Sequence, residues 1–199
     1  MIKHPIGVFI SGRGSNLKSI INASKDLDFP GKVSVVFSDD PDAKGMKLAY
    51  KNNIDAISLD INNFKDKNEF EEKILKLIEP YNLKLACLAG YMKILSKRFI
   101  NKFPARIINI HPSLLPKYKG LNTHRRAIEN KETVTGCTVH YVNENLDDGE
   151  IILQKEISIG NNDTEQTLAD KVLKEEHLIY PEAIKLVLKK WYPHQKKNV

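Results

Sequence analysis

The chain has 199 residues, of which 41% are hydrophobic and 28% charged, and its formal net charge is +6. This length is enough for one sizeable domain with a hydrophobic core, and the composition is ordinary for a globular protein. The positive charge allows an anionic ligand or a nucleic acid as partner. However, the sequence has no basic stripe interleaved with aromatic residues, the pattern that binds single strands.

No apolar run approaches the length needed to span a membrane, and the N-terminus leads straight into a short strand rather than a signal peptide. Two cysteines, Cys87 and Cys137, lie among apolar or small neighbours without a CxxC motif, which indicates reduced thiols in the core. We therefore expect a cytoplasmic protein that neither crosses a membrane nor binds nucleic acid.

Strands and helices alternate through the first half of the chain. The expected strands are Ile6–Ile10, Val33–Phe37, Ala56–Leu59, Leu85–Ala89 and Arg106–His111. The expected helices between them are Asn16–Ser24, Ala43–Asn52, Asn68–Glu79 and Ser96–Asn101. This alternation predicts an α/β fold with a mostly parallel, doubly wound, Rossmann-like sheet and helices on both faces.

The pattern changes in the second half. After an expected helix at Thr123–Asn130, the strand-like runs Thr135–Val142 and Glu150–Ile159 follow each other too closely for a crossover helix. They predict an antiparallel pair at or near one edge of the sheet. A final helix is expected to begin at Asp163, with a capping box to Gln166. Pro181 is expected to kink or restart this helix.

The segment RIINIHPSLLPKYKG, residues 106–120, is the strongest candidate for a functional site. Asn109 and His111 are two residues apart on the expected strand, so both side chains point to the same face. Pro112 then ends the strand, and ligands of open α/β sheets bind beyond the carboxyl ends of such strands. The competing interpretation is a buried strand whose polar residues merely cap its end.

A glycine-rich turn, SGRGSN, follows the first expected strand. Gly12 and Gly14 let the backbone approach a ligand, and the amides of Gly14, Ser15 and Asn16 would open a helix towards an anion. A dinucleotide-binding fingerprint is the competing reading. Its third glycine is replaced by Leu17, so we favour a site for one phosphate group.

Asp147, in the LDDG stretch, lies far from His111 in sequence but on a loop that could cross the same end of the sheet. A carboxylate is the usual partner that orients an active-site imidazole, although an Asp-Asp-Gly turn is often only turn chemistry. The remaining histidines show no spacing that indicates a metal site, and no Ser or Cys lies in a nucleophile elbow. An enzyme of this kind would take its nucleophile from a substrate.

Four stretches together, SGRGSNL, LAGYMKILS, NIHPSLLPKYKG and LDDGEIIL, closely resemble the formyl-folate transferase family, and within it the phosphoribosylglycinamide formyltransferases. The resemblance runs over nearly the whole chain. It implies one formyltransferase domain over residues 1–199, with a nucleotide-binding half (1–105) and a catalytic, folate-binding half (106–199). It also implies transfer of a formyl group from 10-formyltetrahydrofolate to the amine of glycinamide ribonucleotide in purine (IMP) biosynthesis, without a metal.

The resemblance also implies roles for individual residues. The three catalytic residues would be Asn109, His111 and Asp147. The ribonucleotide-binding residues would be Gly14, Ser15, Asn16 and Glu176. The folate-binding residues would be Lys67, Met92, Lys93, Ile94, Leu95, Asn143, Glu144, Asn145 and Leu146, together with Asn109 and Asp147. Lys67 and Lys93 stand where relatives often carry arginine, which keeps the charge but loses the planar fork of a guanidinium group.

Three alternatives remain open. A related hydrolase that deformylates the same folate usually carries an additional N-terminal domain, for which we expect no room before Ile6. Methionyl-tRNA formyltransferase shares SLLP but resembles a longer chain with a C-terminal tRNA-binding domain. A non-catalytic nucleotide-binding module is the alternative from another class. For the formyltransferase, the expected partners are its small-molecule substrates, glycinamide ribonucleotide and the formyl-folate, and the protein is expected to be a monomer or a homodimer.

Overall fold

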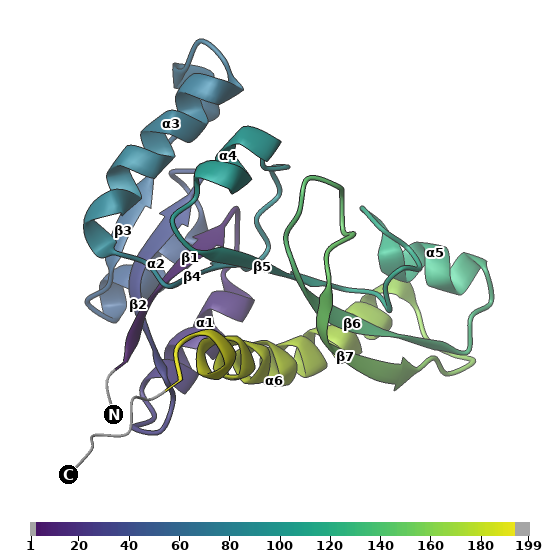
Figure 1. Cartoon of the computed structure of the whole chain (residues 1–199). Helices are drawn as coiled ribbons and strands as arrows, with labels where there is room; N and C mark the ends of the chain where they lie inside the picture. The colour runs from purple at the N-terminus through teal and green to yellow at the C-terminus, as the bar shows by residue number, and fades with distance from the viewer. Residues whose placement is uncertain (1–2, 194–199) are drawn as a thin grey trace.

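Seven strands form one sheet in the order β3-β2-β1-β4-β5-β6-β7 (Figure 1). The structure is a computed structural model and describes residues 3–193. The strands are β1 (His4–Ile10), β2 (Gly31–Ser38), β3 (Asp55–Ser58), β4 (Leu85–Leu88), β5 (Arg106–His111), β6 (Val134–Tyr141) and β7 (Ile151–Ser158). Strands β1 to β5 are parallel to one another, and β6 is antiparallel to both β5 and β7. The predicted fold class is confirmed.

Helices cover both faces of the sheet. The helices are α1 (Ser15–Ser24), α2 (Lys44–Lys51), α3 (Lys67–Ile78), α4 (Lys97–Lys102), α5 (Thr123–Glu129) and α6 (Glu165–Trp191), with short 3-10 turns η1 (Ile61–Asn63) and η2 (Glu79–Tyr81). Figure 1 shows α1 and α6 together on one side and α3 and α4 on the other. No helix among residues 3–193 is long and apolar enough to cross a membrane.

Two hydrophobic clusters form the core because alternate strand residues point to opposite faces. On β1, Val8 and Ile10 pack with Leu17 of α1 and Ile184 of α6 on one face. Phe9, between them, packs on the other face with residues of α3 and α4, such as Phe70 and Phe99. Cys87 and Cys137 are buried, free thiols within this core, as predicted.

The last helix differs from its prediction at two points. Its N-cap is Thr164, not Asp163, and the capping box closes on Thr167 rather than Gln166. Asp163 instead accepts a hydrogen bond from the amide of Gly160, so it closes the preceding turn. Of the two outcomes expected at Pro181, a restart does not occur: the helix runs unbroken to Trp191, and Tyr180 and Ala183 on either side of the proline are buried.

The strand order reverses between β1 and β4, which are neighbours at the centre of the sheet. In doubly wound sheets, the loops that leave such neighbouring strands diverge and open a crevice at their carboxyl ends. The glycine-rich turn follows β1, the LAGYMKILS stretch follows β4, and His111 ends β5. All three therefore lie along the same edge of the sheet.

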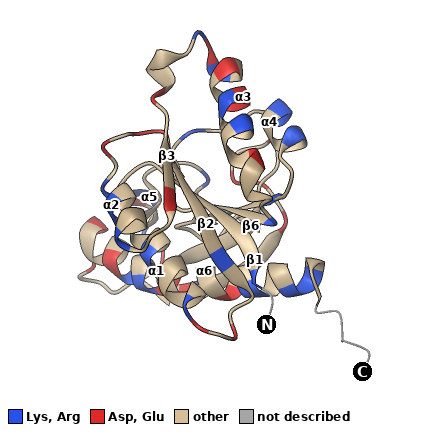
Figure 2. Ribbon diagram, turned by 90° about the vertical axis from the view of Figure 1, so that its left-hand side faces the viewer, with Lys and Arg blue, Asp and Glu red and all other residues tan. Residues whose placement is uncertain are grey.

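Charged residues of both signs are interspersed along the helices in the ribbon of Figure 2. Some of these charged residues form ion pairs between helices: Glu72 of α3 contacts Arg98 and Lys102 of α4 at 2.8 and 2.6 Å. These exposed pairs contribute little stability individually, but they join α3 to α4 beside the loop that follows β4.

Candidate functional site

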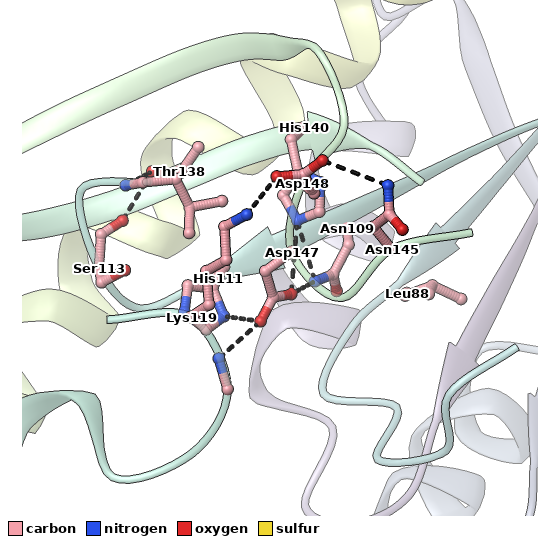
Figure 3. Close-up of polar contacts among 12 residues, drawn as sticks. Leu88, Asn109, His111, Ser113, Lys119, Thr138, His140, Asn145, Asp147 and Asp148 are labelled. Carbon is pink, nitrogen blue, oxygen red and sulfur yellow. Dashed lines mark hydrogen bonds and ion pairs between the residues drawn. The ribbon is translucent and has the colours of Figure 1, made fainter. Parts of the chain in front are cut away.

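Asp147 joins the two candidate residues of β5 (Figure 3). Its Oδ2 lies 3.3 Å from Nδ1 of His111, and its Oδ1 lies 3.5 Å from Nδ2 of Asn109. The three side chains come from two segments, β5 and the β6–β7 loop. The side chains of His111 and Asp147 are only 6% and 9% exposed. The structure thus brings together the amide, the imidazole and the distant carboxylate.

Both nitrogens of the His111 ring face oxygen acceptors. Nδ1 faces Asp147, and Nε2 lies 2.9 Å from the carbonyl oxygen of Tyr118. Asp147 in turn accepts a hydrogen bond of 2.9 Å from the backbone amide of Gly120. The ring is therefore held on both sides, and a doubly protonated imidazolium would satisfy both acceptors.

His140 is a part of this site that sequence reasoning missed. It lies directly opposite Asn109 in the antiparallel register of β5 and β6. Its Nε2 is 3.3 Å from Nδ2 of Asn109, and its Nδ1 is 2.8 Å from the carbonyl oxygen of Tyr141. Burial is the largest cause that lowers the pKa of His140 from its ordinary value. The neutral ring can then donate through Nδ1 and accept from Asn109 through Nε2.

A buried hydroxyl network supports the loop that follows His111. Thr138, which is fully buried, donates to the carbonyl oxygen of Ser113 at 2.6 Å and accepts from the amide of Leu115 at 3.1 Å. Gln154 also donates to the Thr138 hydroxyl at 2.9 Å. Figure 3 shows Thr138 and Ser113 beside the catalytic candidates. This network fixes the backbone that presents Tyr118 to His111.

The glycine-rich turn has the backbone geometry that a close approach requires. Gly14 has φ of +75°, and a Cβ there would lie 2.8 Å from the Cα of Gly45. Gly14 is the N-cap of α1, and no side chain caps this helix. The first amides of α1, including those of Ser15 and Asn16, are thus not used by a side-chain cap and can face an anion.

Asn16 and Glu176 meet beside this turn, although they are 160 residues apart in sequence. Nδ2 of Asn16 donates to Oε2 of Glu176 at 2.7 Å, and both residues are 7% exposed. Oδ1 of Asn16 is buried without a hydrogen-bond partner among the described residues. Burial raises the pKa of Glu176, and the hydrogen bond from Asn16 opposes that shift. The pair brings polar atoms together at the start of α1.

The residues proposed for folate divide into exposed and buried groups. In the segment after β4, Met92 and Ile94 are 67% and 60% exposed, while Leu95 is only 7% exposed and packs in the core. Any contact by Leu95 would therefore come through its main chain. Lys93 lies 3.8 Å from Asp39, and Lys67 of α3 lies 3.9 Å from Glu71.

The β6–β7 loop carries the other folate candidates. Asn143 accepts a hydrogen bond of 3.0 Å from the amide of Asn145, and Glu144 contacts Lys97 at 3.0 Å. Leu146 is 49% exposed, and Asp147 follows it with φ of +47°. This left-handed residue turns the loop back towards β5. Residues 3–193 contain no group of three or more candidate metal ligands.

Comparisons with known proteins identify sequences and structures that are similar to this chain. The family model described as formyl transferase matches residues 5–184. Phosphoribosylglycinamide formyltransferase of Escherichia coli (strain K12) is 41% identical over 176 residues, which cover 88% of this chain and 83% of that protein. A crystal structure of glycinamide ribonucleotide transformylase 1 from Symbiobacterium toebii has a TM-score of 0.91 and 41% identity, covering 94% of this chain and 89% of that one.

A longer relative matches as well. The human trifunctional purine biosynthetic protein adenosine-3 is 39% identical over 93% of this chain, but the chain spans only 18% of the length of that protein. The family model covers far more than half of this sequence, and its relatives share both the sequence and the arrangement of the sheet. This chain therefore belongs to the formyl transferase family.

Proposed function

We propose that this chain transfers the formyl group of 10-formyltetrahydrofolate to the amine of glycinamide ribonucleotide. The observation that carries the proposal is the meeting of Asp147 with both His111 and Asn109 at the carboxyl end of β5. The names of the similar proteins from Escherichia coli and Symbiobacterium toebii support the same reaction. The roles given below to individual residues belong to this proposal.

The reaction is an acyl transfer. The amine nitrogen of the ribonucleotide bonds to the formyl carbon and gives a tetrahedral oxyanion, after which the bond from that carbon to N10 of the folate breaks. One proton leaves the attacking amine and one reaches N10, so charge and atoms balance. A site for this chemistry needs donors aimed at the oxyanion and a positive charge nearby.

Asn109 supplies the donor. Its Nδ2 carries two hydrogens: one faces His140 at 3.3 Å and the other faces Asp147 at 3.5 Å. The second contact is at the outer limit of a hydrogen bond, so the formyl oxygen can replace the carboxylate as its acceptor. His111 contributes the positive charge of its imidazolium form, which Asp147 orients and balances.

The ribonucleotide would bind at the start of α1. The amides of Gly14, Ser15 and Asn16 would hold its phosphate, since a helix N-terminus attracts anions. Glu176 would accept hydrogen bonds from ribose hydroxyls. Its contact with Asn16, at the start of α1, supports this role.

The folate would bind between the segment after β4 and the β6–β7 loop. Met92 and Ile94 offer exposed apolar surface, and Leu95 offers its main chain. The loop from Asn143 to Leu146, with Glu144 and Asn145, would close over the pterin ring. Lys67 and Lys93 would attract the negatively charged tail of the folate.

The remaining proposals concern the protein as a whole. We place the nucleotide-binding half at residues 1–105 and the catalytic, folate-binding half at 106–199, working as one domain across a single sheet. We also propose that the protein acts in the cytoplasm as a monomer or a homodimer. Its partners would be its two small-molecule substrates.

One experiment separates this function from that of a hydrolase and from that of a non-catalytic binding module. Purified protein is mixed with 10-formyltetrahydrofolate, and the loss of its absorption spectrum is followed with and without glycinamide ribonucleotide. Loss that requires the ribonucleotide supports the transferase. Loss without it would identify a hydrolase, and binding of both molecules without any loss would identify a non-catalytic binding module.

A further inference from the structure

The segment Met92–Leu95 presents exposed side chains while both of its ends are held in place. Met92 and Ile94 are among the most exposed large hydrophobic residues of the described chain. Exposed apolar side chains lose little by moving, so a binding surface built from them needs support from elsewhere. That support comes from two carboxylates, Asp39 and Glu71, whose side chains are only 6% and 5% exposed.

Asp39 holds the first end through a serine. The hydroxyl of Ser11, at the end of β1, donates to Oδ1 of Asp39 and accepts a hydrogen bond of 2.8 Å from the amide of Met92. The amide of Ser11 also donates to the carbonyl oxygen of Gly90 at 3.1 Å. Ser11 begins the glycine-rich turn, so this contact joins the turn after β1 to the segment after β4.

Glu71 holds the second end directly. Its Oε1 accepts from the amide of Ser96 at 2.8 Å, and its Oε2 accepts from the Ser96 hydroxyl. The same hydroxyl accepts a hydrogen bond of 3.0 Å from the amide of Phe99 and caps α4. Because Glu71 is buried on α3, it fixes the end of the segment to a rigid element.

Each carboxylate also restrains one lysine of the folate site. Lys93 lies 3.8 Å from Asp39, and Lys67 lies 3.9 Å from Glu71. Both lysines are nearly half exposed, so their ammonium groups remain open to an anion from solvent. The two carboxylates thus set the position of the backbone segment and of the charges that flank it.

Tyr91, which precedes the segment, is affected by the charges of both Asp39 and Glu71. The centroid of its ring lies 5.8 Å from that of the Phe9 ring. Its hydroxyl is buried without a hydrogen-bond partner in the described part of the chain. Burial, followed by the charges of Asp39 and Glu71, raises the pKa of Tyr91. The charges of both carboxylates therefore act on Tyr91, the residue just before the segment.

We propose that Asp39 and Glu71 are positioning residues that hold Met92–Leu95 in the conformation that binds folate, an inference that rests on the proposed function. Asp39 acts through Ser11 and so also ties the segment to the ribonucleotide turn. Glu71 acts on the folate side alone. Neither residue touches the reacting atoms.

The test replaces each carboxylate by its amide and measures steady-state kinetics with both substrates. Glu71→Gln is expected to raise KM for 10-formyltetrahydrofolate by about 10-fold or more, because the charge-assisted bonds to Ser96 become neutral and one acceptor oxygen is replaced by a donor. Its kcat and its KM for the ribonucleotide should change less than roughly twofold. Asp39→Asn should raise KM for folate similarly and also raise KM for the ribonucleotide, since Ser11 begins the turn that would bind it.

Matched controls separate this effect from loss of any acidic residue. Glu72→Gln removes the neighbouring carboxylate of α3, which contacts Arg98 and Lys102 of α4 but not Ser96. Asp42→Asn removes an exposed carboxylate from the loop after β2. Both controls should leave the two KM values unchanged. Ser96→Thr, which keeps a hydroxyl and an amide, should retain folate affinity better than Ser96→Ala.

Calorimetric titration with tetrahydrofolate makes the test independent of catalysis. Weaker binding by folded Glu71→Gln, with faster amide exchange in residues 90–96, supports the proposal. Unchanged binding in both amide variants, or equal loss of folate and ribonucleotide affinity in Glu71→Gln, would overturn it. A wild-type chain that binds tetrahydrofolate but transfers no formyl group would refute the proposed activity alone.

Discussion

Asn109 donates through Nδ2 to Nε2 of His140 at 3.3 Å, and this contact fixes which way the Asn109 amide faces. His140 can only accept at Nε2 while its proton sits on Nδ1, which lies 2.8 Å from the carbonyl oxygen of Tyr141. A His140 ring protonated on both nitrogens would face Asn109 with a second donor. The orientation of the proposed oxyanion donor thus depends on the charge of a neighbour.

The first prediction is an acid limb in the pH profile of kcat that belongs to His140. Burial lowers the pKa of His140 below its ordinary value of 6.5, so the ring becomes charged only in more acidic solution. As pH falls through that lowered value, Asn109 loses His140 as an acceptor and kcat should decline. His140→Gln, which keeps an acceptor, should remove this limb, and His140→Ala should lower kcat by about 10-fold across the profile.

His177→Gln is the matched control, because burial also lowers the pKa of His177 but this residue lies on α6. It should leave the acid limb in place. The free energy of unfolding should change with pH in the same direction as kcat. Because the pKa of His140 is lowered in the folded state, its contribution to stability is complete above pH 6.5 and is lost as pH falls below that value. An acid limb that survives in His140→Gln would contradict the assignment.

The second prediction concerns the charge pair at the centre of the site. His111→Ala should lower kcat by roughly 10²–10⁴-fold with the fold intact, because it removes the positive charge beside the oxyanion. Asp147→Asn should act similarly by weakening the imidazolium form. The control is Asp148→Asn, which removes the next carboxylate of the same loop and its contact with Lys119. Turnover at the wild-type rate by correctly folded His111→Ala would rule out this role.

The third prediction tests the phosphate site. Asn16→Ala removes the group that links α1 to Glu176, and Ser15→Ala removes the first side chain of the helix. Both should raise KM for the ribonucleotide more than KM for the folate. Asn22→Ala, an exposed change near the other end of α1, serves as the control in steady-state kinetics. An unchanged KM for the ribonucleotide would place the phosphate elsewhere.

The fourth prediction is that ionisation of Glu176 lowers the free energy of unfolding as pH rises. Burial raises the pKa of Glu176 above its ordinary value of 4.5. The unfolded chain therefore ionises first as pH rises, and the folded protein loses stability between 4.5 and the raised value. Glu176→Gln cannot ionise and should lack this decline when urea unfolding is measured across pH. Equal slopes for the two proteins would show that Glu176 ionises freely in the folded state.

Local pattern was enough to predict much of this molecule. The β-branched run at Ile107–Ile110 and the apolar run at Leu85–Leu88 identify parallel strands, because buried strands are apolar on both faces. The spacing of Asn109 and His111 places them on one face. The nearness of Asp147 rested on an expected loop path, which the register of β6 and β7 then fixed.

Other features depend on pairing that no local pattern contains. His140 sits within an ordinary-looking strand, and only its register opposite Asn109 makes it part of the site. The alternation of side chains along β6 predicts that His140 lies on the same face as Thr138. It does not predict which residue of the neighbouring strand lies beside His140. The N-cap of α6 was predicted one residue early because Asp163 and Thr164 are both good caps. Asp163 is used by Gly160 instead.

The fifth prediction concerns the hydroxyl beneath the loop that follows His111. Thr138→Val keeps the shape of the side chain but leaves the amide of Leu115 and the carbonyl oxygen of Ser113 buried without this partner. It should lower the free energy of unfolding by about 1–3 kcal/mol. Thr138→Ser keeps the hydroxyl and loses a methyl group, so it should cost less than Thr138→Val in urea unfolding. Since the same loop presents Tyr118 to His111, kcat should fall more in Thr138→Val than in Thr138→Ser. If Thr138→Val is as stable and as active as the wild type, the loop is held by its other contacts and not by this hydroxyl.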